Sequence, residues 1–238
     1  FNHESVYTQQ LMDRITNYWL NEYNADGFRF DFTKGFTNTA GEGWNYDAAR
    51  IAILKRMADA IWSAKPGAYV ILEHLTDNSE ETVLANYGLM LWGNMEHQYS
   101  EASMGYASDF SWGIHSARGF SYHNLVSYME SHDEERQMYS SLTYGNSTNP
   151  SHDVKNEDIA LARSGMSAAF YLLTPGPKMI WQFGELGYDK GINHCPNGTY
   201  NSDCRTSRKP IPWDSPLNYD EDAERLAAIR PEFGALDA

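Results

Sequence analysis

Short apolar runs alternate with amphipathic helical segments along most of this chain. The runs typical of strands cover residues 27–32, 69–73, 89–92, 125–129 and 178–183. Parallel strands are joined by crossovers of a dozen or more residues, usually a helix, so this order predicts an α/β fold with a parallel sheet. Open doubly wound sheets and closed (β/α)8 TIM-type barrels both fit the order of elements.

Apolar residues at helical spacing mark the segments that connect these runs. The predicted helices cover residues 4–24, 46–63, 76–87, 97–107, 156–173 and 220–229, with a polar loop over 140–155. Prolines and glycines follow several of them, as at Pro66-Gly67 and Pro175-Gly176-Pro177, and are typical of helix ends.

Composition excludes several classes of partner. The formal net charge is -14 and no basic cluster interrupts it, so nucleic acid and anionic membranes are poor partners. No stretch approaches the roughly 20 apolar residues that a membrane-spanning helix needs, so we expect no membrane insertion. No glycine-rich phosphate loop follows any predicted strand, which disfavours nucleotide binding. A neutral ligand fits this chain better.

The stretch 25–34 places charge on a strand that the sequence predicts to be buried on both faces. Phe28, Phe30 and Phe32 alternate with Arg29 and Asp31, so the two charged side chains face away from the phenylalanines. Such a charge is costly unless it is paired or used in chemistry. An aspartate that only pairs with its neighbouring arginine is the structural alternative.

Acidic residues follow three of the predicted strands. Asp31 and Glu73 lie at the carboxyl ends of the runs 27–32 and 69–73, and Asp133 comes four residues after the run 125–129. Each alone could cap a helix, but the carboxyl ends of parallel strands meet at one edge, where barrels carry their chemistry. Glycoside hydrolysis uses two carboxyl groups, one ionised and one protonated. Arg29 would keep Asp31 ionised, and Glu73, leaving an apolar run, would carry the proton.

Four motifs in order resemble the alpha-amylase family of retaining glycoside hydrolases. They are GFRFD at 27–31, ILEH at 71–74, SHD at 131–133 and GPKMIWQFGE at 176–185. They are similar to the family's fourth, fifth, seventh and eighth barrel strands. The resemblance implies that Asp31 is the nucleophile, that Glu73 is the general acid and base, and that Asp133 holds the hydroxyls of the sugar being cleaved.

The same resemblance assigns three substrate-binding residues. Arg29 would orient Asp31, His132 would donate to the sugar in the cleavage subsite, and Lys34 would touch the sugar on the leaving-group side. Two positions depart from the family pattern, because Gly35 stands where many members have histidine and Ser131 replaces a common asparagine.

The resemblance implies that residues 1–238 are the C-terminal half of a catalytic barrel, about strands four to eight, with no second domain. The first three strands, an inserted domain and its calcium ligands would belong to a missing N-terminal half. The chemistry would need no cofactor and this chain would hold no metal, while the full-length enzyme could hold a structural Ca²⁺ ion. We expect the isolated piece to be weakly active or inactive.

These features predict a hydrolase that cleaves α-glucosidic bonds in starch-like glucans or maltooligosaccharides by a retaining mechanism. A transglycosylase would pass through the same covalent intermediate and is the alternative within this class. A non-catalytic carbohydrate-binding relative is the contrasting alternative, and the presence of all three acids argues against it.

Two cysteines, Cys195 and Cys204, lie nine residues apart in a turn-rich loop. They could form a disulfide, which would indicate export, or remain free thiols; a metal site is less favoured because only His194 lies beside them. The segments 192–205 and 209–214 resemble amylase-like enzymes exported by Bacteroidetes-type bacteria. We therefore expect a bacterial protein of the periplasm or the cell exterior.

Overall fold

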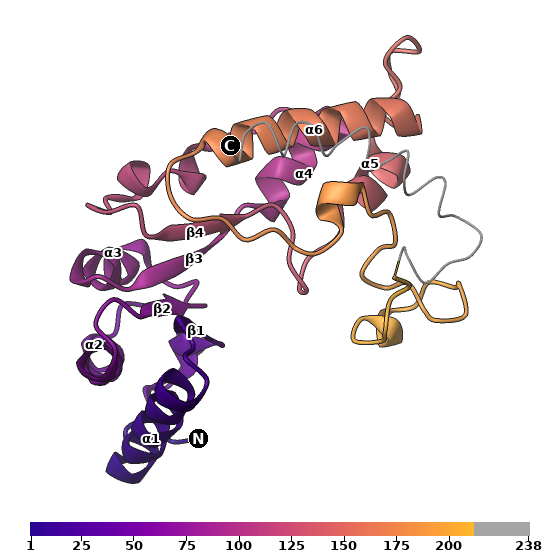
Figure 1. Cartoon of the computed structure of the whole chain (residues 1–238). Helices are drawn as coiled ribbons and strands as arrows, with labels where there is room; N and C mark the ends of the chain where they lie inside the picture. The colour runs from indigo at the N-terminus through magenta and orange to yellow at the C-terminus, as the bar shows by residue number, and fades with distance from the viewer. Residues whose placement is uncertain (212–238) are drawn as a thin grey trace. The chain divides into compact units, whose positions relative to one another are not determined.

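The computed structural model describes residues 1–211, which divide into two compact units (Figure 1). The first unit consists of Phe1–Gly93 and Ile114–Val126. The second consists of Asn94–Gly113 and the described residues from Ser127 onward. Each unit has its own cluster of buried apolar side chains.

Within residues 1–211, four strands and six α-helices follow one another, separated by turns and short 3-10 helices. Their order is α1 (Val6–Glu22), β1 (Gly27–Phe30), α2 (Ala48–Ala64), β2 (Tyr69–Leu72), α3 (Asn78–Tyr87), β3 (Met90–Asn94), α4 (Glu96–Met104), β4 (Leu125–Tyr128), α5 (Gln137–Tyr144) and α6 (Glu157–Leu173). The strands form one sheet in the order β1-β2-β3-β4, in which the β1–β2 and β2–β3 pairs are parallel. The predicted α/β fold with a parallel sheet is confirmed.

Helix α2 shows why the first unit folds as it does. The Asp47 side chain accepts hydrogen bonds from the N–H groups of Ala49 and Arg50, which caps the helix start. One stripe of the helix, including Leu54 and Ile61, is buried against the unit's core. Helix α2 packs between α1 and α3 (Figure 1).

The strands of the first unit pair closely. Gly27 of β1 lies opposite Tyr69 of β2, and a Cβ at this glycine would lie 2.2 Å from the Tyr69 carbonyl oxygen. Only glycine permits this approach of the two backbones. Leu72 and Leu91 are fully buried beneath the helices, and the Leu91 N–H donates to the Asn124 carbonyl at 2.9 Å.

Strand β1 is shorter than the alternating pattern of 27–32 predicts. It ends at Phe30, and Phe32 adopts the left-handed conformation with φ of 46° and a 55% exposed side chain. The Phe32 N–H donates to the Glu73 carboxylate at 2.9 Å, and the Thr33 N–H donates to the Glu73 carbonyl at 2.8 Å. These two bonds turn the chain out of the sheet. The prediction that Phe32 shares a buried face with Phe28 and Phe30 is therefore wrong.

The second unit is organised by α4, α5 and α6, each of which packs against the other two. The Tyr171 hydroxyl of α6 lies 2.9 Å from the carbonyl oxygens of both Ser127 and Met179, which ties this helix to β4 and to the chain that follows α6. The core includes Met95, Tyr99, Met138, Ala160, Leu161 and Tyr171.

Two predictions in the second unit are wrong. The run 178–183 forms a single parallel bridge between Lys178 and Ser127 instead of a strand, and the chain then turns at Phe183 (φ of 72°) into a 3-10 helix at Gly184–Leu186. Helix α5 occupies the start of the predicted loop 140–155. Met138 and Ser141 of this helix are buried, whereas a polar loop would leave them exposed. The predicted helices 97–107 and 156–173 are confirmed as α4 and α6, and residues 220–229 lie outside the described part.

Replacing Leu54 by alanine tests the packing of the first unit. This side chain is fully buried, so its truncation removes apolar contacts and leaves a cavity. We expect the free energy of unfolding to fall by about 2–5 kcal/mol. Denaturant unfolding measures the loss, with Leu173→Ala as the matched control because Leu173 is 70% exposed. Equal effects of the two substitutions would contradict this core assignment.

Candidate active site

One guanidinium connects the two carboxylates at the ends of β1 and β2. Arg29 Nη1 lies 2.7 Å from Asp31 Oδ1, and Arg29 Nη2 lies 2.9 Å from Glu73 Oε2. The guanidinium also stacks over the Trp92 ring of β3, 4.8 Å from its centroid. The side chains of Asp31 and Glu73 are 77% and 16% exposed. Neighbouring parallel strands thus bring the predicted catalytic pair onto one cation.

The turn after β1 gives the Glu73 carboxylate a hydrogen-bond donor, the Phe32 N–H at 2.9 Å. The Thr33 hydroxyl lies 2.9 Å from the Glu73 carbonyl. Glu73 is therefore held at both its carboxylate and its backbone by the chain that carries Asp31. The apolar run before Glu73 does not indicate these contacts, since they depend on the turn at Phe32.

A buried ion network lies behind this turn. Arg50 of α2 pairs with Glu80 of α3 through Nε at 2.7 Å and Nη2 at 2.8 Å. His74 Nε2 lies 2.8 Å from the same carboxylate, and His74 Nδ1 lies 2.9 Å from the Thr33 hydroxyl. Arg50 also donates to the Lys34 carbonyl at 2.8 Å. The network thus ties the segment that follows Asp31 to the segment that follows Glu73.

No motif in the sequence predicts this network. Arg50 shares the inward helical spacing of Leu54 and Ile61, and a charged residue on such a stripe is a signal that a buried partner exists. Its partner, Glu80, comes from another helix, so the pairing itself is not visible in the sequence.

Glu80→Gln tests the network. Burial raises the pKa of the Glu80 carboxyl, but hydrogen bonds from His74, Arg50 and the Asp47 N–H outweigh burial and lower it below 4.5. Glutamine leaves the Arg50 charge buried and unpaired, so we expect unfolding free energy at neutral pH to fall by about 3–5 kcal/mol. The carboxylate stabilises the fold above pH 4.5, so the difference from wild type should shrink as the pH falls through the lower, folded-state pKa.

Denaturant unfolding over a range of pH values measures this difference. Glu22→Gln, at the exposed end of α1, is the control and should leave stability unchanged. A constant difference between wild type and Glu80→Gln from neutral to acidic pH would contradict the assigned charge state.

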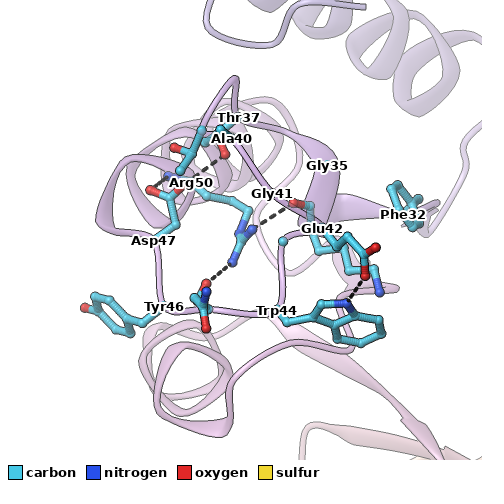
Figure 2. A pocket seen from close by; sticks show the side chains of 14 residues that line it. Phe32, Gly35, Thr37, Ala40, Gly41, Glu42, Trp44, Tyr46, Asp47 and Arg50 are labelled. Carbon is cyan, nitrogen blue, oxygen red and sulfur yellow. Dashed lines mark hydrogen bonds between the residues drawn. The ribbon is translucent and has the colours of Figure 1, made fainter.

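Lys34 lies at a pocket of about 390 Å³ formed by the loop after β1. Its ammonium nitrogen lies 3.2 Å from the centroid of the Trp44 ring. The Trp44 Nε1–H donates to Glu42 at 2.9 Å (Figure 2). Burial lowers the pKa of Lys34, an effect that the Glu73 and Glu42 carboxylates partly offset. Half-exposed aromatic rings therefore border the pocket beside an ammonium group.

His132 and Asp133 lie together in the second unit. His132 Nε2 is 3.1 Å from Asp133 Oδ2, and both side chains are about half exposed. The Asp133 N–H donates to the Ser131 hydroxyl at 3.1 Å. These residues line a pocket of about 420 Å³, with Trp181 and Arg205 among its other lining residues.

The structure therefore gathers the six predicted site residues in two sets. Arg29, Asp31, Lys34 and Glu73 belong to the first unit, and His132 and Asp133 belong to the second. That one site unites the two sets stays a prediction.

Cys195 and Cys204 form a disulfide, with their Cα atoms 5.1 Å apart. Residues 1–211 contain no group of three or more His, Cys, Asp or Glu side chains that could hold a metal ion. Among the helices of this described range, none is long and apolar enough to cross a membrane.

No protein-family model and no curated protein matches the chain, but solved structures resemble it. Amy13B from Eubacterium rectale superposes with a TM-score of 0.60 at 17% identity, covering 99% of this chain and 48% of that one. A pullulanase from Anoxybacillus sp. LM18-11 complexed with maltotetraose gives 0.61 at 17% identity, covering 98% and 34%. An alpha-amylase from Geobacillus thermoleovorans complexed with acarbose gives 0.62 at 13% identity, covering 100% and 46%.

At these identities the likeness establishes the fold alone, an α/β fold shared with alpha-amylase and pullulanase structures. The chain spans between a third and a half of the length of these three structures.

Proposed function

We propose that this chain carries catalytic residues of a glycoside hydrolase that cleaves α-glucosidic bonds in starch-like glucans. The observation that carries the proposal is the Arg29 guanidinium, 2.7 Å from Asp31 and 2.9 Å from Glu73. Glycoside hydrolysis uses two carboxyl groups beside one glycosidic bond. The shared fold supports the assignment, since solved structures of this fold are complexed with maltooligosaccharides.

In the proposed reaction Asp31 attacks the anomeric carbon of a glucosyl unit while Glu73 gives its proton to the leaving oxygen. Glu73 then takes a proton from water, which attacks the same carbon and releases Asp31, so the anomeric configuration is retained. Arg29 orients the nucleophile through its hydrogen bond of 2.7 Å to Asp31. The Phe32 N–H, at 2.9 Å, fixes the direction of the Glu73 carboxyl group.

The surroundings of both sets of residues suit a sugar. The pocket at Lys34 is bordered by Phe32, Trp44 and Tyr46, whose side chains are 55%, 55% and 51% exposed, and aromatic faces stack on the CH-rich faces of sugar rings. We assign Lys34 to the leaving-group side. Asp133 and His132 would hold the hydroxyls of the glucosyl unit that is cleaved.

We further propose that residues 1–238 form a single domain, about strands four to eight of a TIM-type barrel, completed by the rest of a longer polypeptide. The partial coverage of the matched structures supports this arrangement. The isolated piece should then be weakly active or inactive. The disulfide supports an exported enzyme, because disulfides persist in oxidising compartments.

Asp31→Asn and Glu73→Gln test the catalytic assignment in the native polypeptide that contains this chain. Each substitution removes one carboxyl group and keeps the volume of the side chain nearly the same. We therefore expect turnover of a soluble glucan to fall by roughly three or more orders of magnitude. Release of reducing sugar measures the rate, and circular dichroism checks the fold. Asp26→Asn, whose side chain is 85% exposed, should keep wild-type turnover. Near-normal cleavage by either active-site variant would refute the assignment.

The stereochemistry of the product tests the two-step mechanism. A covalent intermediate on Asp31 predicts that the newly released reducing end is first formed as the α-anomer. Proton NMR during the first minutes of cleavage separates the two anomers. Initial formation of the β-anomer would contradict the mechanism, and an added acceptor sugar shows whether transglycosylation competes with hydrolysis.

A further inference from the structure

Arg205 contacts Asp133 at two points. Its Nη2 atom donates to the Asp133 carbonyl and lies 3.4 Å from Asp133 Oδ1. The other carboxylate oxygen, Oδ2, faces His132 Nε2 at 3.1 Å. Each oxygen of Asp133 therefore has one cationic or donor neighbour. A carboxylate has about four lone-pair sites, so sites remain for sugar hydroxyls.

A disulfide holds the backbone that carries Arg205. Cys204, the preceding residue, is bonded to Cys195, which is 5% exposed. The Arg205 N–H donates to the Ser202 carbonyl at 3.1 Å. The Lys209 ammonium donates to the Cys204 carbonyl and lies 3.4 Å from the Arg205 carbonyl. The segment before Arg205 and the segment after it are thus both fixed.

A second connection joins the disulfide loop to the segment of Asp133. The Glu135 carboxylate accepts the Ile192 N–H at 2.7 Å and the Arg136 N–H at 2.8 Å. Glu135 lies two residues after Asp133, and Ile192 lies three residues before Cys195. Glu135 therefore ties the segment of Asp133 to the segment that leads into the disulfide loop. Both partners of the Arg205–Asp133 contact are restrained in this way.

An exposed ion pair contributes little to stability when both side chains must give up conformational freedom to form it. Arg205 and Asp133 are each about half exposed, so their contact alone would not hold the carboxylate in one orientation. The disulfide changes this balance, because it closes the loop that ends at Cys204 and so restricts the backbone next to Arg205 before the pair forms.

We propose that Arg205 is a positioning residue for Asp133 and that the Cys195–Cys204 disulfide keeps Arg205 within reach of this carboxylate. The inference rests on the proposed function, in which Asp133 holds the sugar at the cleaved bond. Nothing in the four sequence motifs assigns Arg205 a role, and its position next to Cys204 is the only sequence signal.

Arg205→Met, Arg205→Lys and Cys195→Ser/Cys204→Ser in the native polypeptide test the proposal. We expect Arg205→Met to lower kcat/KM on maltooligosaccharides about a hundredfold, as misplacement of a reacting group does, with Arg205→Lys partly restoring it. The disulfide variant should lose roughly tenfold, and a reductant should lower wild-type activity to the same level. Asp203→Asn, an exposed charge change within the disulfide loop, should match wild type.

Hydrogen exchange provides a readout that does not depend on catalysis. Arg205→Met and the disulfide variant should each increase exchange in peptides covering residues 131–134, whereas Asp203→Asn should not. Unchanged exchange at residues 131–134 in these variants would overturn the proposal. If Arg205→Met raised KM without changing this exchange, the result would indicate that Arg205 contacts the sugar directly. Full activity of a folded Arg205→Met enzyme would also overturn the proposal. If the wild type cleaves no glucan, the proposed function fails and exchange alone decides the positioning role.

Discussion

A guanidinium buried between two helices requires a carboxylate beside it, and in the first unit Glu80 meets this requirement for Arg50. The pair is almost fully buried, where an unpaired charge would cost several kcal/mol. Because Arg50 and Glu80 must meet, helices α2 and α3 are fixed in register with each other. The rest of the site in this unit depends on that register, since the same two side chains bind the loops that follow β1 and β2.

The way these loops are bound explains how a sheet edge can present charged groups. Arg50 holds the carbonyl of Lys34, and His74, paired with Glu80, holds the Thr33 hydroxyl. Directly before these fixed points the chain turns at Phe32, whose N–H donates to Glu73. The buried ion network of Arg50 and Glu80 thus restrains the loops beside the more exposed Asp31, Arg29 and Glu73 side chains. Binding groups need such support to keep their geometry.

The second unit holds its acid with several kinds of restraint. The Asp133 side chain is about half exposed, but a buried ion pair between Glu130 and Arg136, at 3.0 Å, closes the segment that carries it. A disulfide, a lysine that binds successive carbonyls and the Glu135 carboxylate restrain the chain around it further.

Periodicity predicted most elements because it reports burial directly. The stripe of Leu54 and Ile61 and the run before Glu73 correspond to α2 and β2. Predictions failed where a contact distant in the chain decided the local structure. Phe32 leaves the strand because Glu73 takes its N–H, 41 residues away. The run 178–183 has strand composition, but it pairs with β4 only through the Lys178–Ser127 bridge before the chain turns at Phe183.

Short segments of the sequence were enough to predict the kinds of residue at the strand ends and their order, since the three acids and the neighbouring arginine are local features. Which groups share a cation depends on the fold, because the Arg29–Glu73, Arg50–Glu80 and Arg205–Asp133 contacts join residues 30 or more positions apart. Pairing over such distances depends on the crossovers and on the disulfide that bring the segments together, and no local pattern records it.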